Sequence, residues 1–521
     1  MRLNVSVLLV FPVVLFVIHI WNAWTAGLFD NWSAALLYPS IGLVKGMPIY
    51  FGHDTGPVND LLYGPIFALF YTPAAFFNTP TPAILTGMFL STTAFFVLCL
   101  LLIVAFGPRA EKRDWPLTIA ACVFFAFVVI AVGGTRFSAL RLKPDGPALL
   151  FLLLGCYVVM RTENGRLGWM RLTLVALFFQ FAFWTKQNNV LACTGVALYL
   201  WLVHDRRSAT RFLLVTAALG ALFLGFWLFL FGPDLWFNMF TLPAQRPLRT
   251  NAPMSNWLYW AGSLWKFLAH GIGPLLLLGF LLGIDPELRR QGLRQYIRDN
   301  RWTALAFVGL AMAPTAYLGY IAIGGAYNSI TNLIVPLLLA SMMLLFRLSG
   351  YRISNADRVP GCSVVPRSVV HAGLVIGSLY LSLAITDPRR ILEELKRSTN
   401  LRDNPQEVAF RYVQNNPGQA FFPWTPLAHI MGENKLYHFD YGLSDRRLGK
   451  EPITKAHFDR YVPPELQFVA YYDAQDFETL GYFLTDFELS ESVSELSGWD
   501  IYRWPRGPVP SNLLKKMLHK P

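Results

Sequence analysis

The sequence predicts an α-helical polytopic membrane protein with a small α/β domain at its carboxyl end. Hydrophobic residues make up 54% of the chain and charged residues only 15%, and the mean hydropathy is +0.40. These values are too apolar for a soluble protein of this length. Apolar runs alternate with short basic clusters until a dispersed polar composition begins at Asp387. We therefore divide the chain into a transmembrane domain, 1–386, and a soluble domain, 387–521.

The charge and the cysteines exclude several other classes. The net charge of +12 is carried mostly by short clusters between apolar runs, where anchoring at the cytoplasmic membrane surface explains it better than nucleic acid does. Of the five cysteines, one lies in a basic loop and four lie in apolar runs, and their spacing predicts neither a disulfide framework nor a zinc site: Cys362, Cys99, Cys122, Cys156 and Cys193.

The first expected transmembrane helix covers Asn4 to Ala26, with its amino terminus inside and a kink at Pro12. A signal peptide is the alternative, but the apolar run is longer than the roughly 7 to 15 residues of a signal core. The next apolar piece, Ile66 to Phe77, is broken by Pro73. Because a spanning helix needs about 20 residues, we expect this piece to lie along the membrane interface.

Ten further spans are expected, which makes eleven and places the carboxyl terminus outside. They are Ala83 to Phe106, Pro116 to Val132, Pro147 to Met160, Leu172 to Trp184, Asn189 to Val203, Phe212 to Phe231, Trp257 to Ile284, Thr303 to Ile323, Leu333 to Phe346 and Val369 to Ile385. The loops expected inside carry dense arginine clusters, as the positive-inside rule requires. The outer loops between spans hold fewer basic residues: Lys45, Arg136, Arg141, Lys143, Lys186, Arg246 and Arg249.

Beyond Asp387 the pattern predicts a small domain of helices and strands. Arg390 to Arg397 and Pro405 to Asn415 are expected to be helical. Leu466 to Tyr472 and Trp499 to Trp504 are expected to be strands. No internal repeat or low-complexity segment is present.

The large first outer loop, 27–82, is the most informative stretch of the chain. A connection between two membrane helices needs only a few polar residues, so a loop of this length indicates a working surface. It opens with Asp30, which has no basic neighbour in sequence. Asp30 is either a general base that faces cations or an interfacial helix cap.

A group of basic residues on the same outer side runs against the positive-inside bias. Arg136, Arg141 and Lys143 precede Asp145 in one loop, and Lys186 ends a span within the polar stretch 185–189. Cations at the membrane edge favour an anion site for a phosphate or pyrophosphate. The alternatives are contact with lipid phosphates, pairing with Asp145, and, for Lys186, snorkelling to the interface.

Three other polar segments give weaker signals. The segment Gly324 to Asn328 is either a tight turn or part of the site, and Phe237 to Trp257 is a second long outer loop suited to a lid over a cavity. His53, Asp54 and Asp60 have no spacing that predicts a metal site.

Together these residues resemble the GT-C superfamily, integral membrane glycosyltransferases that use polyprenyl-phosphate sugars, such as protein O-mannosyltransferases and lipid A aminoarabinose transferases. The resemblance covers roughly the first 335 residues, and the outer α/β domain also resembles the architecture of that family. It rests on the following features: Asp30 after the first helix, Gly46-Met47-Pro48-Ile49-Tyr50 followed by Tyr63-Gly64-Pro65, Leu142-Lys143-Pro144-Asp145, Trp184-Thr185-Lys186-Gln187, and Gly325 to Asn328. Many relatives carry Asp-Glu or Asp-X-Asp where this chain has Asp30-Asn31, so a divalent metal is an option and not a requirement.

The resemblance implies a hexosyl- or pentosyltransferase in the cell envelope, multi-pass in a bacterial inner membrane, with loop 27–82 and the carboxyl-terminal domain outside. It implies that Asp30 is the catalytic base of an inverting transfer. Lys186, Lys143 and Arg141 would hold the donor phosphate, and Asp145, Tyr63, Asn328 and Gln187 would contact substrate. The partners would be a polyprenyl-phosphate sugar, a glycan, lipid or protein acceptor, and membrane lipid, but no nucleic acid.

Two other function classes stay open. A transporter or flippase for a lipid-linked saccharide would also need an outward cationic cavity, although the chain shows neither paired halves nor charges deep in its spans. A catalytically inactive scaffold whose outer domain binds a partner is the third. Loss of transfer in an Asp30→Ala variant that is still expressed would argue against both.

Overall fold

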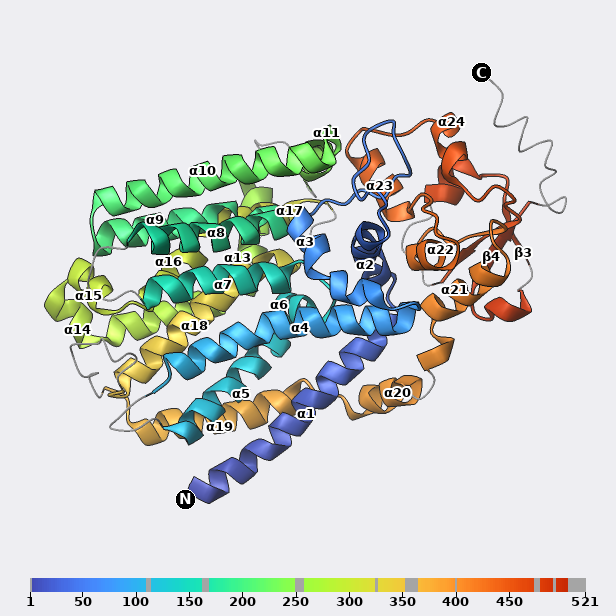
Figure 1. The fold of residues 1–521 in the computed structure, drawn as a ribbon. Coiled ribbons are helices and arrows are strands. Elements are labelled where there is room, and N and C mark those ends of the chain that lie inside the picture. Colours follow the sequence, from blue (N-terminus) through green and yellow to red (C-terminus); the bar gives the residue numbers. More distant parts are fainter. Residues whose placement is uncertain are drawn as a thin grey trace.

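The computed structural model describes residues 2–108, 114–161, 168–248, 257–323, 327–351, 364–398, 401–472, 478–490 and 493–504. Long helices form a bundle, and the carboxyl-terminal elements pack against one end of it (Figure 1). The main bundle helices are α1 (Arg2–Leu28), α4 (Pro80–Ala105), α5 (Trp115–Ala131), α7 (Asp145–Met160), α8 (Trp169–Thr185), α9 (Ala192–Val203), α10 (Arg206–Phe231), α13 (Trp257–Ile284), α16 (Thr303–Ala311), α17 (Ala313–Ile321), α18 (Thr331–Leu348) and α19 (Arg367–Ala384).

A helix lies in each of the eleven ranges that the sequence predicts as spans, and the chain is a multi-pass membrane protein. Within the described residues, six helices are long and apolar enough to cross a membrane, or up to eight if each of two bent helix pairs is one span. α5 ends at a 105° bend and continues as the short helix α6 (Gly133–Leu140), which the sequence predicted as loop. The predicted span 303–323 is likewise two helices, which meet at Met312.

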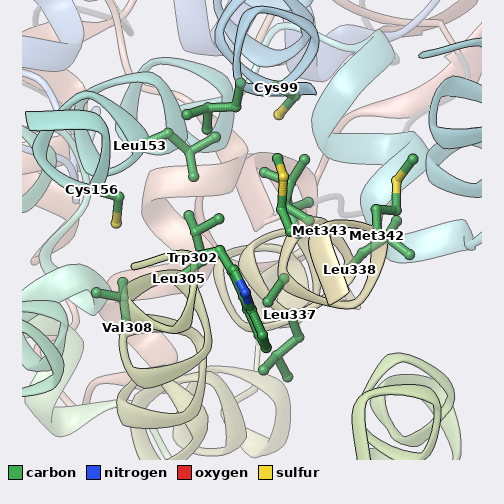
Figure 2. Close-up of a cluster of buried hydrophobic side chains, with 14 of the residues drawn as sticks. Cys99, Leu153, Cys156, Trp302, Leu305, Val308, Leu337, Leu338, Met342 and Met343 are labelled. Carbon is green, nitrogen blue, oxygen red and sulfur yellow. The ribbon is translucent and has the colours of Figure 1, made fainter. Parts of the chain in front are cut away.

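Shorter helices connect the long ones at both ends of the bundle. They are η2 (Gln187–Leu191), α11 (Pro233–Trp236), the π-helical turn η3 (Phe237–Thr241), α12 (Leu242–Gln245), α14 (Pro286–Gln291), α15 (Leu293–Asp299) and η4 (Tyr327–Ile330). The bundle core is apolar and closely packed, and it includes Cys99 of α4, Leu153 of α7, Val308 of α16 and Met343 of α18 (Figure 2). This core holds α7, and with it the amino-terminal residue Asp145, in a fixed place.

The first outer loop is largely folded. α2 (Asn31–Val44) begins where the Asp30 side chain accepts a hydrogen bond from the Trp32 amide, and α3 (Pro65–Phe70) and η1 (Thr72–Phe76) follow. The short length of α3 and η1 agrees with the expectation that 66–77 does not form a span. Figure 1 shows α2 between the bundle and the carboxyl-terminal elements, and its Leu37 and Ile41 share one core with Leu427 and Ile430.

The carboxyl-terminal part is α/β, as the sequence predicts. Its elements are α20 (Pro388–Ser398), η5 (Leu401–Asp403), α21 (Pro405–Asn415), β1 (Ala420–Phe421), α22 (Pro426–Gly432), α23 (Asp440–Leu448), α24 (Lys455–Phe458), η6 (Asp459–Tyr461), β2 (Phe468–Tyr471), η7 (Thr479–Phe483), β3 (Glu488–Ser490), η8 (Ser494–Leu496) and β4 (Asp500–Arg503). The strand order is β1-β2-β4-β3, with β1 parallel to β2 and β4 antiparallel to both of its neighbours.

Strand β2 shows why this sheet is covered on both faces. Phe468 and Ala470 pack with α21, whereas Val469 and Tyr471 pack in a second core with α23 and α24. Successive side chains of a strand point to opposite faces, so all four residues are buried. The sheet therefore fixes α23 on the side that faces the first outer loop.

Candidate functional site

The polar centre of the end of the bundle that meets the carboxyl-terminal part is a buried ion pair between α7 and α8. Lys186 follows the last residue of α8, and its Nζ donates to Asp145 Oδ1 over 2.6 Å. Asp145 stands in the first turn of α7, and its Oδ2 accepts from Asn328 Nδ2 over 2.9 Å. A buried charge needs a partner and further hydrogen bonds, and Asp145 gives Lys186 both a partner and a fixed direction.

Lys186 lines a cavity of about 300 Å³ at this end of the bundle. Four of the residues predicted from sequence meet in its lining, namely Tyr63, Lys186, Gln187 and Asn328. Gln187 is held because its Nε2 donates to the carbonyl oxygen of Leu62 over 2.9 Å. Within the part of the chain that the structure describes, Gln187 Oε1 is buried and has no hydrogen-bond partner. The cavity is therefore lined by a lysine and by polar side chains whose positions are fixed by hydrogen bonds.

A glycine brings the first outer loop against this cavity. A Cβ built on Gly64 would lie only 1.9 Å from the carbonyl oxygen of Trp184. Any larger residue would push the loop away from the end of α8. Gly64 thus explains how Tyr63 and Lys186, far apart in sequence, come to line one cavity.

Arg246 is a site residue that sequence reasoning placed only in a lid loop. It follows α12 and lines the same cavity as Lys186. Its Nη2 forms an ion pair with Asp445 and donates to the Tyr441 hydroxyl over 3.3 Å. Asp445 and Tyr441 lie on α23 in the carboxyl-terminal part, and no sequence motif marked either of them.

Asp30, Arg141 and Lys143 form a neighbouring group outside the lining of this cavity. Asp30 Oδ2 lies 3.7 Å from Arg141 Nη1, and each side chain is 22% exposed. Asp30 Oδ1 accepts from the Trp32 amide over 3.0 Å, so Asp30 is also a helix cap. The ammonium of Lys143 lies 4.5 Å from the Phe137 ring centre and 5.3 Å from that of Trp32.

Lys143 connects the two groups electrostatically. Burial lowers its pKa to about 8; the carboxylates of Asp30 and Asp145 oppose this shift, and the cations of Arg141 and Lys186 add to it. The backbone around Lys143 is held because Tyr71 donates its hydroxyl hydrogen to the Lys143 carbonyl over 2.7 Å. The sequence analysis predicts that these charges lie on one side of the membrane, and in the structure they act on one another electrostatically.

A second, mostly apolar cavity of about 480 Å³ lies between α8, α10 and η3. Its lining includes Phe183 and Trp184 of α8, Ala217 and Leu224 of α10, and Phe240 of η3. Trp184 lines this apolar cavity and precedes Lys186 by two residues, so both cavities lie near the carboxyl-terminal end of α8. Helix α10 also exposes large apolar side chains along its length, including Leu214, Leu222 and Phe229.

The residues that gave weaker signals in the sequence either form ion pairs within the structure or lie outside the described residues. His53 pairs with Asp54 and Glu451, and Asp60 forms a buried ion pair with Arg446. Gly325 and the rest of 324–326 lie outside the described residues, as do 249–256 of the predicted lid. Among the residues that the structure describes, no group of three His, Cys, Asp or Glu side chains is arranged to hold a metal ion.

Comparison with known proteins identifies the fold. No protein-family model matches the chain. No curated protein matches it either. A solved structure of similar fold is ArnT from Cupriavidus metallidurans bound to undecaprenyl phosphate, with a TM-score of 0.52 and 10% sequence identity over 94% of this chain and 97% of that chain. The chain therefore has an ArnT-like fold over nearly its whole length.

Proposed function

We propose that this chain is a glycosyltransferase that moves a sugar from a polyprenyl-phosphate donor to an acceptor hydroxyl at the outer face of the membrane. The observation that carries the proposal is that two cavities lie near the same end of α8: an apolar one lined by Trp184 and a second one lined by Lys186 and Arg246. A ligand with a long apolar tail and an anionic head matches this pair of cavities. The ArnT structure of the same fold holds undecaprenyl phosphate, a molecule of that kind.

In this proposal the isoprenoid tail occupies the apolar cavity between α8 and α10. Burial of apolar surface contributes about 25 cal/mol per Å², so the tail supplies much of the donor affinity. The phosphate lies in the polar cavity against Lys186, and Asp145 keeps the ammonium of Lys186 aimed there. Lys143 and Arg141 add positive potential from the adjoining group. These cations stabilise the charge that develops on the leaving phosphate.

Asp30 acts as the general base. The acceptor oxygen attacks the anomeric carbon as the bond between that carbon and the phosphate oxygen breaks. The bonding electrons leave with the phosphate, and the hydroxyl proton passes to the Asp30 carboxylate. Attack from the face opposite the phosphate inverts the anomeric configuration. Tyr63, Gln187 and Asn328, which line the polar cavity, orient the sugar.

We further propose that loop 27–82 and an outer domain, 387–521, lie on the extracytoplasmic side of a bacterial inner membrane. The shared core of α2 and α22 supports this, since it places both segments on one side of the bundle. Arg141, Lys143 and Lys186 lie at the same end.

The test is transfer of radiolabelled sugar in membranes that contain the full chain and a panel of polyprenyl-phosphate sugars. We expect one donor to be consumed by the unchanged protein and Lys186→Ala to lose at least a hundredfold in transfer. Lys435→Ala, which removes an exposed lysine of the outer part, is the matched control and should leave transfer intact. Transport of the intact lipid-linked sugar without transfer would favour a flippase, and full activity of Lys186→Ala would refute the assigned phosphate site.

A further inference from the structure

Helix α23 of the carboxyl-terminal part reaches the polar cavity through Arg246. Tyr441 and Asp445 stand four residues apart, and residues so spaced lie on one helix face. Both contact the Nη2 atom of Arg246. The side chains of Arg246 and Asp445 are only 11% and 4% exposed, so this ion pair is buried. An otherwise flexible guanidinium is thus held in one direction by a different part of the chain.

Arg246 lines the polar cavity together with Lys186 and Gln187. Its Nε is enclosed by protein, and among the described residues it has no hydrogen-bond partner. A guanidinium in such surroundings keeps a strong positive potential, because little water screens its charge. The part of Arg246 that lines the cavity would therefore attract an anionic group placed there.

Tyr441 also connects the cavity with the Asp30 group. Its ring lies edge-on to Trp32 at 4.7 Å between ring centres. Trp32 follows Asp30 by two residues, and its ring faces the ammonium of Lys143. Tyr441 of α23 therefore contacts Arg246, which lines the polar cavity, and Trp32, which lies beside the Asp30 group.

A second interaction anchors α23 to the first outer loop. Arg446 Nε donates to both carboxylate oxygens of Asp60 over 2.9 and 3.0 Å, and its Nη1 and Nη2 donate to the carbonyl oxygens of His53 and Gly52. Asp60 has φ of +35°, a conformation that non-glycine residues rarely adopt. Because Arg446 fixes the helix against this loop, the direction that Asp445 gives to Arg246 is also fixed.

We infer that Asp445 and Tyr441 are positioning residues that set Arg246 for binding of the donor headgroup, so that the carboxyl-terminal domain completes the donor site. This inference rests on the proposed function, because the anion that Arg246 receives is the polyprenyl phosphate. An arginine held by a carboxylate presents its free N–H groups in a fixed geometry, which favours recognition of phosphate oxygens.

The experiment measures binding of undecaprenyl phosphate to the purified full-length protein in detergent. The unchanged chain is compared with Asp445→Asn, Arg246→Ala and the double variant. We expect Asp445→Asn to weaken binding roughly tenfold, within the range of coupling between residues of one salt-bridge network, and to have no further effect once Arg246 is removed. Asp445→Glu should recover part of the affinity. Equal losses from Asp445→Asn in both backgrounds would show that Asp445 acts independently of Arg246 and would overturn the inference.

Two further variants separate positioning from simple loss of structure. Tyr441→Phe keeps the ring against Trp32 and removes only the hydroxyl that accepts from Arg246, so we expect a smaller loss of affinity at an unchanged melting temperature. Arg447, like Asp445, lies on α23, and Arg447→Gln breaks its ion pair with Glu478, which precedes η7. This variant should bind as the unchanged protein does. Unaltered binding by both Asp445→Asn and Tyr441→Phe would overturn the inference while leaving the proposed function intact. No binding by the unchanged chain would refute both.

Discussion

Asp30 has two separable roles in the structure, and one pair of substitutions distinguishes them. Its Oδ1 caps α2 by accepting from the Trp32 amide, and its Oδ2 faces Arg141. Asparagine caps helices about as well as aspartate, whereas alanine does not. Asp30→Asn therefore removes the proposed base and retains the cap, and Asp30→Ala removes both.

The structure sets the size of each effect. Loss of the cap costs about 1 kcal/mol, and an ion pair that is 3.7 Å long and 22% exposed at both partners contributes at most about 1 kcal/mol. We therefore expect Asp30→Asn to change the free energy of unfolding by no more than about 1 kcal/mol. Loss of a general base lowers the rate by about 10² to 10⁴, equivalent to roughly 3 to 5 kcal/mol of barrier.

The assay is single-turnover transfer at saturating donor, with thermal unfolding of each variant measured in parallel. Asp205→Asn, which alters the aspartate cap of α10, is the matched control and should leave the transfer rate unchanged. We expect Asp30→Asn and Asp30→Ala to lose similar activity, while Asp30→Ala loses about 1 kcal/mol more stability than Asp30→Asn because only alanine removes the helix cap. If Asp30→Asn transfers sugar within about threefold of the unchanged chain, the carboxylate is only a helix cap and the proposed base is wrong.

Three further predictions concern a titrating lysine, a close contact and the apolar cavity. Because burial lowers the pKa of Lys143 to about 8, transfer should fall as the pH rises through this value, and Lys143→Arg should remove that alkaline limb from the pH–rate profile; a limb that persists would refute this role. Gly64→Ala brings a Cβ to 1.9 Å from the Trp184 carbonyl oxygen, so we expect a lower melting temperature and at least tenfold slower transfer. The control is Gly279→Ala, whose Cβ meets no atom within 4 Å. It should lower neither the melting temperature nor the transfer rate. Ala217→Trp fills the apolar cavity and should weaken undecaprenyl phosphate binding several-fold. The control is Gly225→Trp on the same helix, where a Cβ has open space. An equal loss of binding in this control would show that the cavity is not the tail site.

The helices of the bundle were predictable because a hydrophobic run long enough to span a membrane has few other ways to satisfy its backbone. The strands around Val469 and Ile501 were predictable from short apolar runs in a polar context. Helix α2 was not, because Asn31–Val44 carries no charge and contains Pro39, and its sequence was therefore interpreted as a loop. It is helical because the bundle on one side and α22 on the other bury nearly all of its residues.

The candidate site was predictable in its residue types and in one of its pairings. Lys186 and Gln187 stand out in sequence because polar residues interrupt two apolar runs. Pairing of the basic group with Asp145 was one of the alternatives, and Asp145 of α7 is the partner of Lys186. The partner of Arg246 is Asp445, near the other end of the chain. That contact depends on how distant helices pack, and a single sequence carries no local signal for it.

These pairings also distinguish Lys143 from the other cations of the candidate site. Lys186, Arg246 and Arg141 each face a carboxylate, namely Asp145, Asp445 and Asp30. Within the described ranges, Lys143 has no carboxylate at ion-pair distance, and aromatic rings face its ammonium.

Asp30 and Asp145 therefore only partly offset the effect of burial on the pKa of Lys143, which lies at about 8 in place of the ordinary 10.5. The unfolded chain binds this proton more tightly than the folded chain does, so stability contributed by Lys143 rises between pH 8 and 10.5. A phosphate that enters the site supplies the missing anion. Donor binding should accordingly favour the charged form of Lys143, which makes this residue the one where ligand charge and protein charge are most strongly coupled.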